Sequence, residues 1–238
     1  MTIDLNCDMG ELADAPEESL MPLISSANVA CGAHAGDRAT MERTIRLAMR
    51  HNVAVGAHPG YPDKENFGRI ELAMPPEEIE DSVYEQVTAL VSVAKALGCP
   101  LRHVKPHGAL YNAAARDRTV AAAIAAGVRR WNETVPLVGL AGSVMLQVWQ
   151  DAGFRVLAEA FADRAYQADG TLRSRGLPGA LITDPAQAAE QALRIARGGA
   201  AQTICIHGDT PHAVEIARAV RERLLREGVT VLYCRSPR

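Results

Sequence analysis

A short stretch at residues 104–112 gathers several side chains that can hold anions or transfer protons. Its polar members are Lys105, His107, Tyr111 and Asn112. Pro106 cannot donate to a strand ladder, so it ends the short apolar run before it, and Gly108 allows a tight turn afterwards. Polar side chains at the carboxyl end of a strand are what α/β enzymes use to build a site. The stretch therefore predicts one part of an active site.

Five other stretches share this design, with polar residues following a short apolar run. They lie at residues 6–11, 28–37, 58–63, 159–166 and 207–209. If the strands are parallel, their carboxyl ends meet at one edge and the clusters come together. The residues expected there as catalytic candidates are Asp8, Lys105, His107, His34, His58 and Glu159. The expected substrate-binding candidates are Asn6, Asn28, Asp37, Tyr61, Asn112, Arg164, His207 and Asp209. Glu11 and Asp163 are expected at the same place without an assigned role, and His103 lies outside the clusters.

The elements that must position these residues alternate between strand and helix along the chain. Strands are expected at residues 2–5, 27–30, 53–55, 101–104, 136–140, 154–157, 203–206 and 229–233. Seven or eight βα units in 238 residues favour a closed, TIM-barrel-like (β/α) barrel, regular or irregular, and an open doubly wound sheet is the alternative. We predict an α/β fold with a single barrel domain over residues 1–238 and the site at its mouth.

Composition excludes several classes of function. The net charge of -3 gives no electrostatic basis for binding nucleic acid or an anionic membrane. No apolar run approaches the ~20 residues that span a bilayer, and the first residues do not resemble a secretion signal. The five cysteines show no CxxC spacing, which is typical of free thiols in a reducing compartment, with a reactive thiol at Cys7 or Cys31 as the alternative. A cytoplasmic protein is expected.

Each candidate also has a structural explanation. A strand-end histidine is often only hydrogen-bonded, although His34, His58, His107 and His207 together favour a functional cluster. Asp8 and Asp209 suit helix caps or turns equally well, and Arg69 and Arg175 suit either solvated loops or a substrate clamp. Histidine and carboxylate at separate strand ends can bind a divalent metal. Without an HxH or HExxH motif the metal is left open, and no metal ligand is assigned.

Six motifs, in order along the chain, resemble the LamB/YcsF family. They are Asp4–Glu11, Ala27–Asp37, Gly56–Asp63, Val104–Asn112, Glu159–Tyr166 and His207–Pro211. The resemblance implies a barrel related to the glycoside hydrolase/deacetylase type. It also implies one component of ATP-dependent 5-oxoprolinase, which opens the lactam of 5-oxoproline to glutamate while ATP is cleaved to ADP and phosphate. ATP would be a co-substrate bound by or with partner subunits B and C, because no phosphate-loop motif is present.

The chemistry implied by the resemblance suits the candidate residues. Phosphorylation of the lactam oxygen would create a leaving group, and this chain would supply acid and base groups for attack by water. Lys105 suits a developing oxyanion or a phosphate. Because apolar packing does not need charges there, replacing Lys105 or Asp8 by alanine is expected to remove activity and keep the fold. Two alternatives stay open: a metal-dependent amide or carbohydrate hydrolase on the same barrel, and a non-catalytic lactam-binding subunit.

Overall fold

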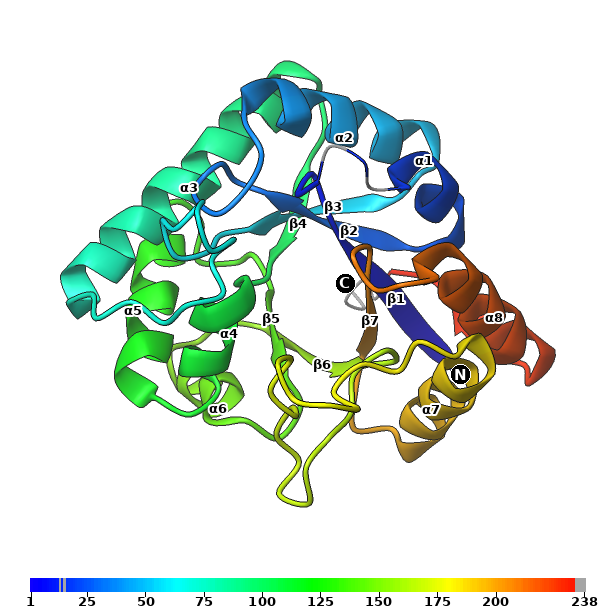
Figure 1. Ribbon diagram of the computed structural model, residues 1–238. Coiled ribbons are helices and arrows are strands. Elements are labelled where there is room, and N and C mark those ends of the chain that lie inside the picture. Colours follow the sequence, from blue (N-terminus) through cyan, green and yellow to red (C-terminus); the bar gives the residue numbers. More distant parts are fainter. Residues whose placement is uncertain (13, 15, 234–238) are drawn as a thin grey trace.

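The computed structural model describes residues 1–12, 14 and 16–233. Over this part of the chain, seven parallel strands close into a barrel with helices around it (Figure 1). The strands are β1 Thr2–Met9, β2 Ser26–Ala30, β3 Ala54–His58, β4 Leu101–Val104, β5 Leu137–Leu140, β6 Val156–Phe161 and β7 Thr203–His207. The ring closes because β1 pairs with both β2 and β7, so Asp8 is in register with Asn28 on one side and His207 on the other. The predicted closed barrel is confirmed.

The helices follow the strands, as the alternating pattern predicts. They are α1 Glu17–Leu20, the short 3-10 helix η1 Met21–Leu23, α2 Arg38–Arg50, α3 Pro76–Ala96, α4 Gly108–Ala114, α5 Arg118–Arg129, α6 Val144–Asp151, α7 Pro185–Gly198 and α8 Ala213–Arg226. Asp117 and Asp184 accept hydrogen bonds from backbone N–H groups in the first turns of α5 and α7, as expected for N-caps. Within the described residues, none of the helices is long and apolar enough to cross a membrane.

The first strand is longer than the sequence predicted. β1 continues to Met9, whereas the polar residues after Leu5 predicted a loop. The reason is period-two alternation: Leu5, Cys7 and Met9 belong to the apolar core between sheet and helices. The alternate residues, including Asp4 and Asn6, contact residues of other strands across the barrel interior. β6 is likewise shifted toward its carboxyl end, which places Glu159 within the strand.

The interior of this barrel is polar rather than filled with branched apolar residues. Near the amino-terminal end, the Asp4 carboxylate accepts hydrogen bonds from the hydroxyls of Ser25, Ser26 and Thr203 at 2.6–2.7 Å. One step further along, Asn6 donates to both Thr203 and Glu159. Burial raises the pKa of Asp4 although these hydroxyls lower it. Hydrogen bonds therefore lead from the bottom of the barrel toward its mouth.

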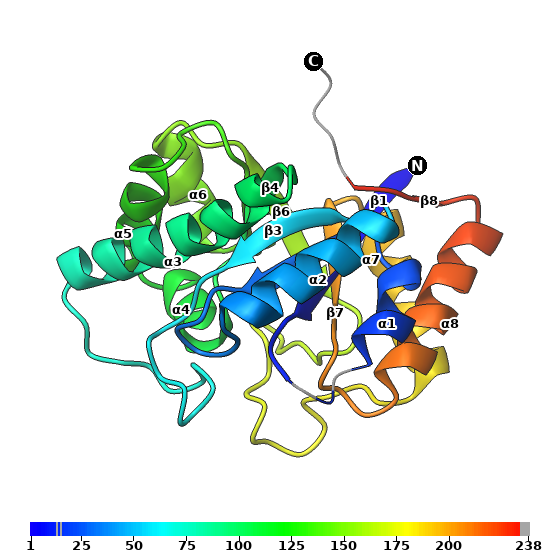
Figure 2. The ribbon, with the colours of Figure 1, turned by 90° about the horizontal axis from the view of Figure 1, so that it is seen from above.

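An eighth strand, β8 Thr230–Val231, pairs with the start of β1 outside the closed ring. It is shorter than the predicted strand at residues 229–233. The chain then crosses the amino-terminal end of the barrel, where Tyr233 stacks on His103 at 5.6 Å and donates to the carbonyl of Arg102. The start of β1 and β8 lie at this end, opposite the long loops that follow β3 and β6 (Figure 2).

Candidate active site

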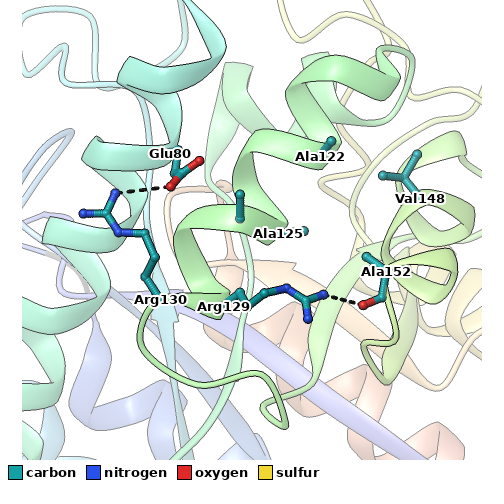
Figure 3. Close-up of a pocket in the computed structure, with 8 residues that line it drawn as sticks. Glu80, Ala122, Ala125, Arg129, Arg130, Val148 and Ala152 are labelled. Atoms are coloured by element: carbon teal, nitrogen blue, oxygen red, sulfur yellow. Dashed lines mark hydrogen bonds and ion pairs between the residues drawn. The ribbon is translucent and has the colours of Figure 1, made fainter.

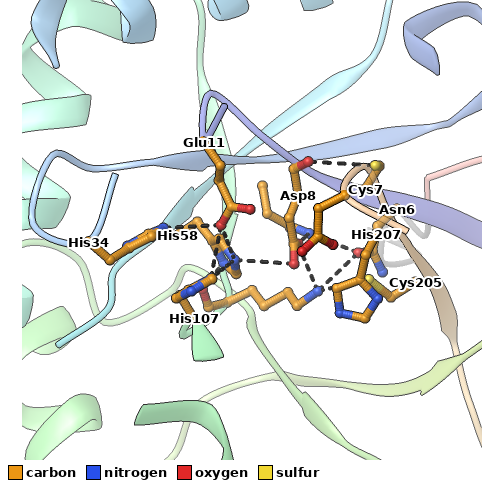
Figure 4. A network of polar contacts seen from close by, with 12 residues as sticks. Asn6, Cys7, Asp8, Glu11, His34, His58, His107, Cys205 and His207 are labelled. Atoms are coloured by element: carbon orange, nitrogen blue, oxygen red, sulfur yellow. Dashed lines mark hydrogen bonds and ion pairs between the residues drawn. The ribbon is translucent and has the colours of Figure 1, made fainter. Parts of the chain in front are cut away.

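Lys105 lies inside the barrel, among polar residues that include Asn6, Asp8 and Cys205 (Figure 4). It directly follows β4, and its ammonium nitrogen is 2.9 Å from both Asp8 Oδ1 and Glu159 Oε1. The same nitrogen is 3.1 Å from Cys205 Sγ and 3.3 Å from Asn6 Oδ1. Burial lowers the pKa of Lys105, but Asp8, Cys205 and Glu159 outweigh it and raise the pKa well above its usual value. Lys105 is therefore a permanent buried cation.

Asp8 is held between this cation and a histidine. Its Oδ1 also accepts from the Asn28 amide at 2.8 Å, and its Oδ2 lies 3.3 Å from His58 Nε2. Burial raises the pKa of Asp8, but His58 and Lys105 overcome that effect and hold it well below its usual value. Asn28 is fixed in turn by His103, whose Nε2 is 2.7 Å from Asn28 Oδ1. Asp8 is therefore a fixed carboxylate at neutral pH.

Three histidines surround Glu11 on the other side of Asp8 (Figure 4). Glu11 Oε1 is 2.9 Å from His107 Nδ1, 3.1 Å from His34 Nε2 and 3.6 Å from His58 Nε2. His58 Nε2 and His107 Nδ1 are themselves 3.0 Å apart. Burial raises the pKa of Glu11, but His107 and His34 lower it far below its usual value. Burial lowers the pKa of His34 to about 4. We call Glu11, His34, His58 and His107 the histidine–glutamate cluster.

A second acidic residue, Glu17, holds the turn that carries Glu11 in place. Glu17, at the start of α1, accepts from the backbone N–H of Gly10 at 2.5 Å and from the Thr44 hydroxyl at 3.1 Å. Glu17 is buried although it belongs to a short helix. Its two acceptor contacts join the end of β1 to α2, so the position of Glu11 is set by the fold rather than by a free loop.

Close packing of backbone against imidazole rings orders the histidines. The rings of His34 and His107 stack with centroids 3.8 Å apart and planes within 2°. A side chain at Gly68 would meet His34 at 2.8 Å and His107 at 3.0 Å, and Gly68 also has a φ of +63°. The same loop supplies the carbonyl of Phe67, 2.9 Å from His107 Nε2. The loop after β3 thus needs a glycine there to close over the stacked rings.

His207 and Asp163 form a second pair at the end of β7. His207 Nδ1 is 3.0 Å from Asp163 Oδ1, and the Thr210 hydroxyl donates to Asp163 Oδ2 at 2.6 Å. Burial raises the pKa of Asp163, but His207 and Thr210 bring it below its usual value. The His207 ring stacks on Phe161 at 5.4 Å. His207 is partly exposed, so it lies on the solvent side of Lys105.

Two arginines from different loops meet Asp209 above the site. Arg175 donates to both Asp209 oxygens, at 2.7 and 3.2 Å, and Arg69 pairs with Oδ2 of the same carboxylate. Burial raises the pKa of Asp209, but Arg175 outweighs it and lowers the pKa. The contact ties the loop after β3 and the loop after β6 to the end of β7, across the mouth of the barrel.

The structure does not bring every predicted site residue to this centre. Asp37 is exposed and caps α2 through the backbone N–H of Thr40 at 2.8 Å. Asn112 is exposed on α4, while Tyr61 is buried in the core. Arg164 is largely buried and donates to the carbonyl of Arg173. The catalytic and substrate-binding roles of all the candidates, these four included, stay predictions. The remaining ten candidates lie in or beside the networks above.

Several members of the networks were not assigned a role from the sequence. They are Glu11, His103, Asp163, Thr203 and Cys205. His103 is two residues before Lys105 in an extended segment, so period-two alternation places both on the same face. A Cβ on Gly56 would lie 2.1 Å from the His103 ring, so that glycine leaves the space which the ring occupies. The alternation was the signal that could have found His103.

A pocket on the outer wall of the barrel lies away from this centre. It is formed by α3, α5 and α6, with Ala122, Ala125 and Val148 among its lining residues (Figure 3). Arg129 donates to the carbonyl of Ala152 at its edge, and Arg130 pairs with Glu80. None of the predicted catalytic side chains is among its lining residues.

Comparisons with known proteins agree with this architecture. The sequence model of the LamB/YcsF family matches residues 3–237. Proteins named as the A subunit of 5-oxoprolinase are 50% identical in Chloroflexus aggregans, over 100% of both chains, and 48% identical in Thermus thermophilus, over 97% of this chain and 99% of the relative. The crystal structure of the lactam utilization protein from Thermus thermophilus superimposes with a TM-score of 0.93 at 47% identity, covering 98% of this chain and 100% of that one.

A more distant likeness concerns the fold alone. The catalytic domain of a peptidoglycan N-acetylglucosamine deacetylase from Eubacterium rectale superimposes with a TM-score of 0.57 at 12% identity, over 99% of this chain and 90% of that one. This likeness confirms the expected fold, a barrel of the deacetylase type.

Proposed function

Because this chain belongs to the LamB/YcsF family, we propose that it is the component of a 5-oxoprolinase that carries the lactam-opening site. The activity is hydrolysis of a cyclic amide, and the relatives that match along the full length of the chain are named as the A subunit of 5-oxoprolinase. One structural observation carries the proposal. A buried Lys105–Asp8 pair, 2.9 Å apart, adjoins the histidine–glutamate cluster at the mouth of the barrel.

Lys105 and Asp8 suit opposite parts of amide hydrolysis. When water attacks the lactam carbonyl, negative charge develops on its oxygen, and a fixed cation such as Lys105 stabilises that charge without reorganising. Asp8 remains ionised, because Lys105 and His58 hold its pKa low despite burial. It can therefore orient the attacking water and accept its proton. Glu159 balances the charge of Lys105 from the far side, and Asn28 keeps Asp8 in position.

The arginines at the mouth suit the carboxylate of 5-oxoproline. Arg175 already forms a two-point contact with a carboxylate, that of Asp209. A guanidinium prefers this bidentate geometry with carboxylates generally. We propose that the substrate carboxylate approaches Arg175 and Arg69 from solvent, which would place the lactam ring toward His207 and Asp8.

ATP and the partner subunits belong to the same proposal. The relatives are named as one lettered component of 5-oxoprolinase, which implies an assembly of several chains. General acid–base catalysis supplies only about 10²–10⁴-fold, whereas enzymes typically provide at least about 10⁶-fold. Activation of the lactam by ATP, bound by or with subunits B and C, would supply the remainder. We place the reaction in the cytoplasm, where the free thiols of Cys7, Cys31 and Cys205 would stay reduced.

The test compares this chain alone, candidate B and C subunits without it, and the mixture, with glutamate and phosphate followed together. We expect ATP-coupled release of glutamate from 5-oxoproline only in the mixture. Asp8→Asn should remove that release, while Asp151→Asn, an exposed carboxylate on α6, should not. No glutamate from a mixture of correctly folded subunits would contradict the proposed activity. Stoichiometric, ATP-coupled release by this chain alone would refute the division of labour.

A further inference from the structure

We propose that the histidine–glutamate cluster is a binding site for one divalent transition-metal ion, with zinc as the preferred ion. Its four ligand atoms are Glu11 Oε1, His34 Nε2, His58 Nε2 and His107 Nδ1, and all of them lie within 4.8 Å of one another. The inference concerns binding by this chain and does not depend on the proposed oxoprolinase activity.

The separations of the ligand atoms suit a tetrahedral ion. With metal–nitrogen bonds of 2.0–2.1 Å, the ligands of a tetrahedral zinc site are about 3.3 Å apart. Glu11 Oε1 is 2.9, 3.1 and 3.6 Å from the three imidazole nitrogens, and two of those nitrogens, of His58 and His107, are 3.0 Å apart. Four of the six separations are therefore close to the tetrahedral value, and the two between His34 and the other histidines are at most 4.8 Å.

The hydrogen bonds on the far sides of two rings decide where their protons lie. His58 Nδ1 is 2.7 Å from the carbonyl of Lys105, and His107 Nε2 is 2.9 Å from the carbonyl of Phe67. A carbonyl oxygen only accepts, so each of these nitrogens carries a hydrogen. In a neutral imidazole the other nitrogen then carries a lone electron pair and no hydrogen. Hydrogen bonding of the outer nitrogen to a backbone carbonyl is also the usual support of a metal-bound histidine.

As a result, electron pairs point at one another inside the cluster. When both rings are neutral, the bare nitrogens of His58 and His107 face each other at 3.0 Å, and the Glu11 carboxylate faces the bare nitrogen of His107 at 2.9 Å. Acceptors at such distances repel unless a cation or a shared proton lies between them. A metal ion satisfies these acceptors at once. It also takes the Nε2 electron pair of His34 when that ring is neutral with its hydrogen on Nδ1, which a single proton cannot do.

The cluster is built rigidly enough to be preorganised. Its ligands come from the ends of the four successive strands β1, β2, β3 and β4 (Figure 4). His34 and His107 are held by ring stacking and by the close approach of Gly68. The three histidines are at least 95% buried. A site with fixed ligands loses little conformational entropy when the ion enters.

The donor set favours zinc among the divalent ions. Three imidazoles and one carboxylate suit zinc and its transition-metal neighbours, whereas magnesium and calcium prefer oxygen ligands. Asp8 Oδ2 lies 3.3 Å from His58 Nε2, just outside the four ligands. An ion here would therefore place positive charge beside the carboxylate that we propose as the base.

The experiment measures binding directly, on a full-length chain without a purification tag and stripped of metal by a chelator. Zinc is titrated calorimetrically, and cobalt is added separately so that its visible absorption reports the coordination geometry. We expect one zinc per chain, an intense tetrahedral-type cobalt spectrum that zinc abolishes, and no comparable binding of magnesium. Glu11→Gln and His58→Gln should each weaken zinc binding by at least about 100-fold. His51→Gln, a change at an exposed histidine after α2, should leave the affinity unchanged.

Two results would overturn the proposal. One is the absence of stoichiometric zinc or cobalt binding to the folded, unsubstituted chain, which would leave a shared proton to reconcile the facing nitrogens. The other is zinc binding that Glu11→Gln and His58→Gln leave unchanged, or that His51→Gln weakens equally. The cobalt spectrum is measured on the unsubstituted chain, so this part of the test does not depend on whether the variants fold. Glutamate release is assayed separately, so loss of the metal site and loss of the oxoprolinase activity are distinguishable.

Discussion

Replacing Lys105 by methionine removes one charge from the centre of the barrel with little change of side-chain length. Its ammonium group is 2.9 Å from Asp8 and 2.9 Å from Glu159, and the three side chains are at most 6% exposed. In the variant, two buried carboxylates share a site without their cation. Removing one partner of a buried ion pair typically costs about 3–5 kcal/mol. The sequence alone led to the opposite expectation, namely that replacing Lys105 leaves the stability of the fold unchanged.

The size of the effect makes it measurable by thermal unfolding. For a chain of this length, each kcal/mol lowers the melting temperature by about 2–4 °C, so we expect Lys105→Met to lower it by about 6–20 °C at pH 7. Lys95→Met, a change at an exposed lysine near the end of α3, should change it very little. Adding Glu159→Gln to Lys105→Met should restore part of the loss, because one of the two unpaired charges is then removed.

The pH dependence of stability gives a second test of the same substitution. Burial raises the pKa of Asp8 in the unsubstituted protein, but His58 and Lys105 hold it well below its usual value. Without Lys105 that pKa rises, and the native state takes up a proton more readily than before. The difference in stability between Lys105→Met and the parent should therefore shrink as the pH falls from 7 toward 4. A melting temperature within about 2 °C of the parent at pH 7, in a correctly folded variant, would refute the reasoning.

Three further predictions concern single residues. In the assembled enzyme, Asp8→Asn should lower kcat by about 10²-fold or more without a matching rise in KM, because it removes the proton acceptor; an unchanged kcat would contradict that role. Arg175→Met should raise KM for 5-oxoproline about tenfold with little change in kcat, as loss of substrate binding does, and an unchanged KM would exclude contact with the substrate. Burial lowers the pKa of His103 to about 3, so the native state keeps it neutral while the unfolded chain takes up a proton below about pH 6.5. Stability should therefore fall as the pH drops from 6.5 toward 3, and urea unfolding of His103→Gln should show a shallower fall than the parent or His51→Gln.

The order of elements could be predicted because strand and helix differ in their apolar period. Short apolar runs alternate with amphipathic helices, and caps such as Asp117 and Asp184 mark helix starts by a local hydrogen bond. These signals are local in sequence. The closure of the ring is not a local feature. However, few folds accommodate so many parallel βα units in one chain, and therefore the number of these units predicted a barrel.

The strand ends were harder to predict, because this barrel has a polar interior. In β1 the inward positions are Asp4, Asn6 and Asp8, which resemble a loop when hydrophobicity is the guide. Their partners lie on other strands, up to 199 positions away in the case of Thr203 and Asp4. A polar residue inside a barrel is satisfied by such distant residues, and the sequence near it carries no sign of them.

The sequence predicted which types of residue gather at the candidate site, but it did not predict the role of each residue. Lys105 and the strand-end histidines stood out because each is polar beside an apolar run. Glu11 received no role because its importance depends on three rings that converge on one of its oxygens. The proposed metal ligands come singly from separate strand ends, and therefore none of the short-spacing motifs that identify metal sites is present in the sequence.

The pairing of the first strand with the last strand of the ring also determines when this protein can finish folding during its synthesis. β1 leaves the ribosome first, but its partner β7 is about 200 residues behind it, with Asp4 in register with Thr203. At about 5–20 residues per second, that is a delay of about 10–40 s. Until β7 arrives, Asp4 and Asn6 lack their partner Thr203, and Lys105 lacks Cys205. The ring can therefore close only after β7 has been synthesised, and this late pairing also completes the surroundings of Lys105.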